Sequence, residues 1–172
     1  MMTGRVWLFG DNINTDLMVP SEVTYAAPEK QARAVFQANR PGWVDQVGQG
    51  DVLIGGRNFG MGSSRPAARS LRNLGLSCML AESLNGLFFR NAVNFGFVAM
   101  ECPGVLALFN EGETAEIDME AWRVTNGDTG KSLPIVPIPE ELRSLMTGGG
   151  IFPHLEKLGL ILPSGSKTGT AA

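Results

Sequence analysis

Gly-Gly-Arg-Asn-Phe-Gly-Met-Gly-Ser-Ser-Arg, residues 55–65, is the stretch on which the predicted fold depends. We call it the glycine turn. The apolar run 51–54 before it indicates a buried strand, and the pattern of 66–74 after it indicates a helix. Its four glycines permit positive φ angles and a close approach of the backbone to a ligand. We expect the Ser63 and Ser64 hydroxyls to cap the helix, with Pro66 at or near its first position.

The glycine turn also offers several donors to an anion. Backbone N–H groups at a helix N-terminus, two serine hydroxyls and the Arg65 guanidinium together suit a carboxylate or a phosphate. A glycine-rich turn with a serine cap that binds nothing has the same residue types. The turn by itself leaves both interpretations open.

Two further motifs accompany the turn. Asp-Asn-Ile-Asn-Thr-Asp, residues 11–16, follows the first predicted strand, and Leu-Phe-Phe-Arg-Asn-Ala-Val-Asn-Phe-Gly, residues 87–96, lies downstream. In this order, and with 58–65 as the most specific match, the motifs resemble the small subunit of the 3-isopropylmalate dehydratase and homoaconitase type. That family is similar to the swivelling fourth domain of aconitase. The resemblance extends from about Val6 to His154.

The resemblance implies a hydro-lyase subunit that isomerises a malate-type hydroxy acid, such as 3-isopropylmalate, by dehydration and rehydration. In the family, the serine that follows the glycine is the base, which corresponds to Ser63. Serine is a weak base, so backbone N–H groups and a cation have to stabilise its alkoxide. The other expected site residues are substrate-binding Asn58, Gly62, Ser64 and Arg65, with Arg65 on a substrate carboxylate, a specificity loop of Val23, Thr24 and Tyr25, and a site wall of Asp11, Asn14, Thr15 and Asp16.

Structural roles are also open for the first motif and for Arg90 in the third. In residues 11–16, which we call the wall loop, Asp and Asn side chains also suit Asx turns that bond nearby backbone N–H groups. Arg90 lies in an apolar helix beside Asn91 and Asn94, where we favour hydrogen bonds to neighbouring loops over anion binding.

The chain has few residues that suit a metal. Cys78 and Cys102 each lie in an apolar run, where we expect small buried thiols, and His154 is expected at the surface or a helix end. Two separate cysteines cannot hold an iron–sulfur cluster alone. The resemblance implies a large subunit that carries a [4Fe–4S] cluster and completes the active site in a heterodimer or heterotetramer. The chain alone is therefore expected to bind no metal or cofactor and to be inactive.

The sequence departs from the family pattern at three places. Met61 stands where Cys is usual, Pro66-Ala67 where Glu-His is usual, and Val23-Thr24 where isopropylmalate enzymes commonly have Tyr-Leu. The last difference keeps homoaconitate, citramalate and other alkyl-malates open as substrates. A non-catalytic anion-binding or regulatory module is the alternative from another class.

Composition narrows the partners further. The chain has 172 residues, 44% of them hydrophobic, which suits one domain with its own core. A net charge of −3 and an isoelectric point near 5.2 give no basic patch for nucleic acid. No apolar run is long enough to span a membrane, and no signal-peptide pattern is present, so we expect a cytoplasmic protein.

The order of predicted elements is α/β. We expect strands over 5–9, 76–81 and 97–101, helices over 28–39 and 83–94, short strands over 114–118, 121–125 and 133–136, and helices over 139–146 and 152–158. Alternating strands and helices favour parallel crossovers. With the resemblance, this predicts one swivelling β/β/α domain over residues 1–163. Residues 164–172, rich in Ser, Gly, Thr and Ala, are expected to be a disordered tail.

Overall fold

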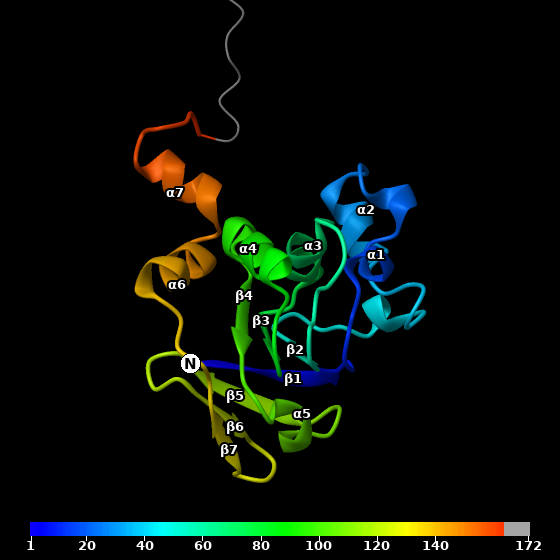
Figure 1. Ribbon diagram of the computed structural model, residues 1–172, viewed down its shortest axis with the longest axis vertical. Helices are drawn as coiled ribbons and strands as arrows, with labels where there is room; N and C mark the ends of the chain where they lie inside the picture. Colours follow the sequence, from blue (N-terminus) through cyan, green and yellow to red (C-terminus); the bar gives the residue numbers. More distant parts are fainter. Residues whose placement is uncertain (164–172) are drawn as a thin grey trace, which may run out of the picture.

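The chain folds around one seven-stranded sheet in the order β4-β3-β2-β1-β5-β6-β7. The computed structural model describes residues 1–163 (Figure 1), so the expectation for the tail at 164–172 lies outside the described residues. The strands are β1 (Met2–Leu8), β2 (Val52–Gly55), β3 (Cys78–Ala81), β4 (Val98–Glu101), β5 (Thr114–Asp118), β6 (Arg123–Asn126) and β7 (Ser132–Pro134).

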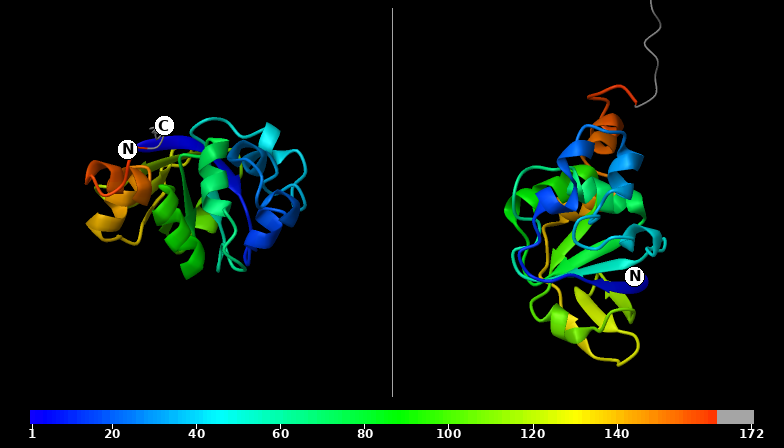
Figure 2. Two further views of the ribbon diagram at one scale, coloured as in Figure 1. Left: turned by 90° about the horizontal axis from the view of Figure 1, so that it is seen from above. Right: turned by 90° about the vertical axis from the view of Figure 1, so that its right-hand side faces the viewer.

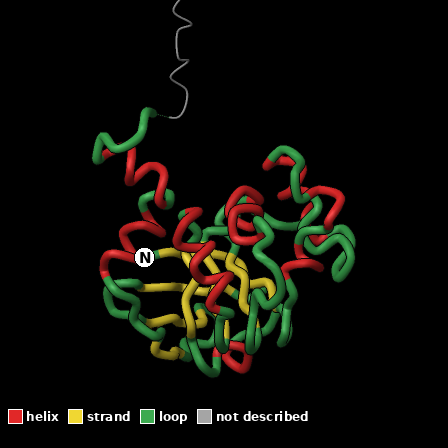
Figure 3. The backbone as a smooth tube through the Cα atoms, turned by 45° about the horizontal axis from the view of Figure 1, so that its top comes forward, coloured by secondary structure: helices red, strands yellow, loops and turns green. Residues whose placement is uncertain are grey.

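One half of the sheet is parallel. The C-terminal part of β1 pairs with β2, β2 with β3, and β3 with β4. Helix α3 (Ala67–Leu74) connects β2 to β3, and α4 (Gly86–Phe95) connects β3 to β4, as predicted from the alternation of elements. The connection from β1 to β2 is longer and consists mainly of loops (Figure 3). It contains the short helices α1 (Thr15–Met18) and α2 (Pro28–Arg33) and two 3₁₀ turns.

The other half is antiparallel and begins on the same first strand. The N-terminal part of β1 pairs with β5, and β6 and β7 follow as a meander. In Figure 1 these strands and α5 (Val105–Leu108) lie below the parallel strands, whereas α1 to α4 lie above them. Helices α6 (Glu140–Thr147) and α7 (Ile151–Lys157) return to contact α4.

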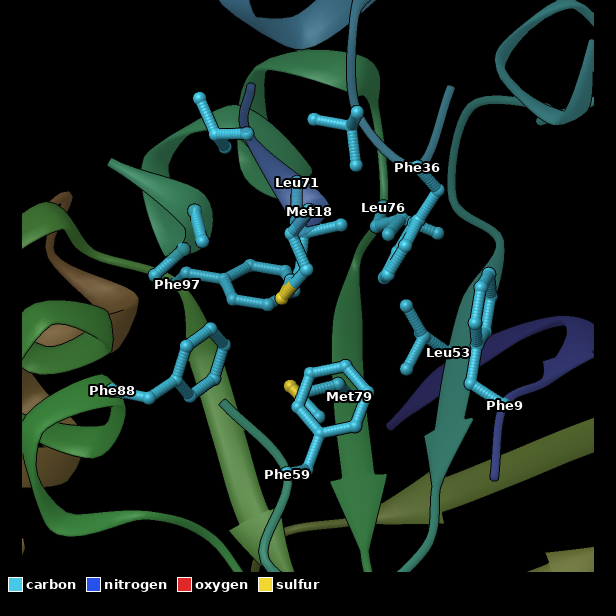
Figure 4. Close-up of a cluster of buried hydrophobic side chains, with 14 of the residues drawn as sticks. Phe9, Met18, Phe36, Leu53, Phe59, Leu71, Leu76, Met79, Phe88 and Phe97 are labelled. Carbon is cyan, nitrogen blue, oxygen red and sulfur yellow. The ribbon is translucent and has the colours of Figure 1, made fainter. Parts of the chain in front are cut away.

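Side chains alternate along the parallel strands and fill two cores, as a strand buried on both faces requires. Leu53 and Met79 face the helices, where Met18, Phe36, Phe59, Leu71, Phe88 and Phe97 surround them (Figure 4). Ile54 and Leu80 face the antiparallel half and pack with Phe109, Ile117 and Val124. The result is three layers, β/β/α, which Figure 2 shows from two further directions.

Several predicted bounds were wrong. The helix expected over 28–39 ends at Arg33, because Phe36 takes a left-handed conformation (φ 57°) and its N–H donates to the Met18 carbonyl. The Phe36 ring is then fully buried. Helices α1 and α5 were missed, because four residues are too few to show a helical period. Across residues 1–163, no helix combines the length and the apolar character that a membrane crossing needs.

Candidate active site

The glycine turn and the wall loop form one unit. They follow β2 and β1, so both lie at the carboxyl ends of adjacent parallel strands, where α/β proteins commonly bind ligands. The Arg57 N–H donates to Asp11 Oδ1 at 2.7 Å. Thr15 is buried, and its Oγ1 donates to the Ser63 carbonyl at 2.6 Å. These bonds fix the backbone of the turn at the serine itself.

The glycines allow this close fit. Gly60 and Gly62 have φ angles of 83° and 99°, which side chains rarely adopt. A Cβ at Gly62 would overlap Asn14 Oδ1, and a Cβ at Gly60 would overlap Phe88. Close approach was expected toward a ligand, but at these two positions it is the wall loop and the core that come close. Asn14 also caps α1 by accepting from the Asp16 N–H at 2.8 Å, so the predicted local turn occurs there.

Ser63, Asp16 and Arg65 meet on one atom. Asp16 Oδ1 accepts a hydrogen bond from Ser63 Oγ and another from Arg65 Nε, the latter at 2.8 Å. These donors hold the pKa of Asp16 below its ordinary value, with the Ser63 hydroxyl as the larger cause. Because an ionised carboxylate only accepts, the Ser63 O–H points at Asp16 and the serine oxygen keeps its lone pairs for other contacts.

The Arg65 guanidinium is held on three sides. Its Nη1 donates to Thr24 Oγ1 and its Nη2 to Ser21 Oγ at 3.2 Å, in addition to the Asp16 contact. A guanidinium has five N–H donors, so two remain, one on each terminal nitrogen. Met61 and Pro66 replace the polar Cys and Glu of the family pattern. Here the polar contacts of Ser63 and Arg65 come from the wall loop and from residues 21–24.

The remaining turn residues are less tightly held. Ser64 is exposed, and its Oγ accepts from Asn91 Nδ2 at 3.1 Å. Asn58 Nδ2 donates to Asn12 Oδ1 at 3.1 Å. Neither serine caps α3, because the cap position is Pro66 and no side chain bonds there. The capping prediction was wrong, since the two hydroxyls bond to other loops.

The exposed backbone at Gly62, Ser63 and Ser64 has three consecutive N–H groups that bond to no other residue within the described part of the chain. Such a run of donors favours an anion. It lies directly beside the Ser63 and Ser64 hydroxyls. This is the feature of the turn that supports the anion site predicted from the sequence.

The predicted specificity loop is brought to the same place. Val23 is buried, Thr24 contacts Arg65, and the Tyr25 side chain is 99% exposed. The structure therefore unites residues 11–16, 21–25 and 58–65. Sequence reasoning missed Ser21, Asn12 and Asn91 as partners, although Asn12 and Asn91 lie inside the quoted motifs.

Neither cysteine fits a cluster. Burial raises the pKa of Cys78 to about 12 and that of Cys102 to about 11. Two cysteines are also fewer than the four thiolates that commonly hold such a cluster. The prediction that both are buried is confirmed. Among residues 1–163, no group of three His, Cys, Asp or Glu side chains is arranged to hold a metal. His154 is exposed on α7, as expected.

Two features lie outside this cluster. A cavity of about 260 Å³ is lined by Leu84, Gly86, Phe89, Glu101, Val136 and Ile138, none of them a predicted site residue. Arg90 is exposed and its side chain bonds to no residue in the described range, so the hydrogen bonds expected for it are not formed.

Comparison with known families decides the wider assignment. The family model of the aconitase C-terminal domain matches residues 10–104, which include both the wall loop and the glycine turn. The chain belongs to the aconitase C-terminal domain family. Within this family its similarity is to small subunits of the 3-isopropylmalate dehydratase type, as the motifs predicted.

Its relatives match along nearly their whole length. The isopropylmalate/citramalate isomerase small subunit of Methanocaldococcus jannaschii is 38% identical over 91% of this chain and 95% of the relative. A 3-isopropylmalate dehydratase small subunit of Thermotoga maritima is 38% identical over 92% of this chain and 97% of the relative. A 3-isopropylmalate dehydratase small subunit of Methanopyrus kandleri is 35% identical over 92% of this chain and 95% of the relative.

A solved structure confirms the fold class. The crystal structure of a 3-isopropylmalate dehydratase from Methanocaldococcus jannaschii matches with a TM-score of 0.86 and 27% identity. The match covers 92% of this chain and 95% of that one. The predicted family and the α/β swivelling fold are therefore correct.

Proposed function

We propose that this chain is the small subunit of a heteromeric hydro-lyase that removes and re-adds water on a malate-type hydroxy acid, with 3-isopropylmalate as the first candidate. The observation that carries the proposal is the meeting of Ser63 and Arg65 on Asp16, beside open backbone N–H groups, in a chain of this family. One relative's name includes citramalate, so citramalate stays a candidate together with homoaconitate and other alkyl-malates.

Ser63 is the proposed base. For this role it first loses its hydroxyl proton to solvent, and the N–H groups of residues 62–64 stabilise the negative charge of the alkoxide. The alkoxide oxygen then takes the proton from the carbon next to a substrate carboxylate, which restores the hydroxyl. Arg65 does not contact the serine oxygen directly, because its Nε bonds to Asp16. Arg65 instead keeps the neighbouring carboxylate neutralised. Asp16 is a positioning residue that orients the Ser63 hydroxyl.

The substrate carboxylate is assigned to Arg65. Its two remaining N–H donors lie on the two terminal nitrogens, which suits a planar carboxylate. Ser64, Gly62 and Asn58 line the same turn and are the further substrate contacts we propose. Val23, Thr24 and Tyr25 are proposed to border the substituent that distinguishes one hydroxy acid from another, because Thr24 contacts Arg65 itself.

The remaining chemistry is assigned to a partner. The residues of this chain do not fit an iron–sulfur cluster, so we propose that a large subunit holds the [4Fe–4S] cluster that the resemblance implies. The names of the relatives as small subunits support such a partner. The two chains would assemble as a heterodimer or heterotetramer, with the exposed turn facing the large subunit.

Co-expression tests this proposal. The chain is produced together with a large subunit from the same genome, and the purified complex is screened with hydroxy acids for the absorbance of the enoate product. We expect turnover by the complex and none by the isolated chain. A complex that binds a hydroxy acid without forming product would instead favour a non-catalytic module.

A further inference from the structure

A buried glutamine lies behind the proposed substrate loop. Gln31, on α2, is only 1% exposed, and both ends of its amide are bonded. Its Nε2 donates to the Thr24 carbonyl at 2.6 Å, and its Oε1 accepts from Arg69 Nη2 at 2.8 Å. The Thr24 carbonyl can only accept and Arg69 can only donate, so the amide has a single satisfied orientation.

Two side chains from elsewhere in the fold hold Thr24, whose own hydroxyl and N–H also donate to the carbonyls of Pro20 and Ser21. Arg65 donates to its hydroxyl, and Gln31 donates to its backbone carbonyl. Arg65 and Arg69, which bonds to Gln31, lie close together in the chain. Arg69 belongs to α3, whose first residue follows Arg65 by two positions. The Arg69 guanidinium lies 5.2 Å from the centre of the Phe95 ring, which keeps this end of the connection in place.

We propose that Gln31 is a positioning residue that fixes the 23–25 segment relative to Arg65. In this way it determines which hydroxy acids the site accepts, according to their alkyl substituent. The proposal rests on the proposed function, because it takes the 23–25 segment to border the substrate. The hydrogen bonds of a buried polar side chain hold its partners in one geometry. A hydrocarbon side chain of similar shape would fill the same space without holding the Thr24 carbonyl in place. With the carbonyl unanchored, Thr24 and the fully exposed Tyr25 can shift while Arg65 stays bonded to Asp16.

The test uses Gln31→Met, which keeps an unbranched side chain and removes both hydrogen bonds. Val35→Ala is the matched control, because Val35 is also buried beside α2 but contributes only apolar contacts. On the isolated chain, hydrogen exchange of the Thr24 and Ala26 amides is expected to rise about 3- to 10-fold in Gln31→Met, the range for loss of one neutral hydrogen bond. No such local rise is expected in the control.

On the assembled enzyme, the measured quantity is the ratio of kcat/KM for 3-isopropylmalate to that for citramalate. We expect Gln31→Met to change this ratio about tenfold and Val35→Ala to leave it unchanged, even if both lower Tm. Unchanged amide exchange would overturn the positioning role whether or not the enzyme is active. Faster exchange with an unaltered ratio would make Gln31 structural only and overturn the proposal. Wild-type complex without turnover on any hydroxy acid would instead refute the proposed function, and the selectivity role with it.

Discussion

Replacing Arg65 by lysine tests whether Arg65 binds a substrate carboxylate or is only a surface charge. The guanidinium donates from three different nitrogens to Asp16, Thr24 and Ser21, and its side chain is 21% exposed. A lysine ammonium carries its donors on one atom, so it keeps the charge but cannot meet three separated partners. The bonds to the two hydroxyls are the ones we expect to be lost.

The magnitude follows from those contacts. A hydrogen bond to a charged group contributes about 1.5–3 kcal/mol, and partial exposure favours the lower end. Because two such bonds are lost, we expect Arg65→Lys to reduce the free energy of unfolding by about 3 kcal/mol. If the two remaining N–H donors also bind a substrate carboxylate, losing one of two parallel bonds raises KM about 10- to 100-fold. Because the carboxylate is bound before and during the reaction, kcat should change less than KM.

The measurements are urea unfolding of the isolated chain and steady-state kinetics of the assembled enzyme. Arg57→Lys is the matched control, since Arg57 is an exposed arginine of the same turn whose side chain bonds to no residue within 1–163. Subunit assembly is checked separately by size-exclusion chromatography. If Arg65→Lys has the same KM and the same unfolding free energy as Arg57→Lys, Arg65 is a surface charge and the carboxylate assignment fails.

Three further changes probe the same site. Ser63→Ala should lower kcat of the assembled enzyme on the order of 10²-fold or more with little change in KM, and near-normal turnover would contradict its role as base. Asp16→Asn should destabilise the isolated chain at neutral pH. Because the folded pKa of Asp16 is depressed, its contribution is present above the ordinary value of about 3.9 and is lost as pH falls through the folded pKa. The difference in unfolding free energy between wild type and variant should therefore shrink below about pH 4, and a constant difference would argue against this linkage. Gly62→Ala should cost about 1–3 kcal/mol in urea unfolding, because its φ of 99° disfavours a side chain and its Cβ would overlap Asn14. Gly10→Ala, at a glycine with open space around it, should cost less than about 0.5 kcal/mol, and equal costs would refute the explanation.

Sequence patterns predicted the parts of the fold that have a strong period. The parallel strands are short apolar runs, and α3 and α4 lie where the strand and helix patterns alternate. The end of α2 was not predictable in the same way. It depends on the burial of Phe36 against Met18 and its neighbours, a tertiary contact that overrides the helical tendency of 34–39.

For the site, the motifs located the residues but not their pairing. Asp16 was expected in a site wall, whereas its bond to Ser63 spans 47 positions and depends on how the wall loop packs on the glycine turn. The same holds for Thr24 and Arg65, which are 41 positions apart. Capping of α3 by serine was a sound local expectation that failed, because the hydroxyls of Ser63 and Ser64 found partners on other loops.

The open geometry of the site has its own consequence for how the enzyme would work. The loops after β1 and β2 supply the wall loop and the glycine turn, and they leave Ser63, Ser64 and Tyr25 exposed. Hydrogen bonds already hold Ser63, Asp16 and Arg65 in place within this chain alone. Under the proposed function, docking of the large subunit therefore has to exclude water and bring the cluster near, but it need not assemble the base and its neighbours. Catalysis would then depend on the position of this whole domain relative to its partner, because the groups that must meet lie on two separately folded chains.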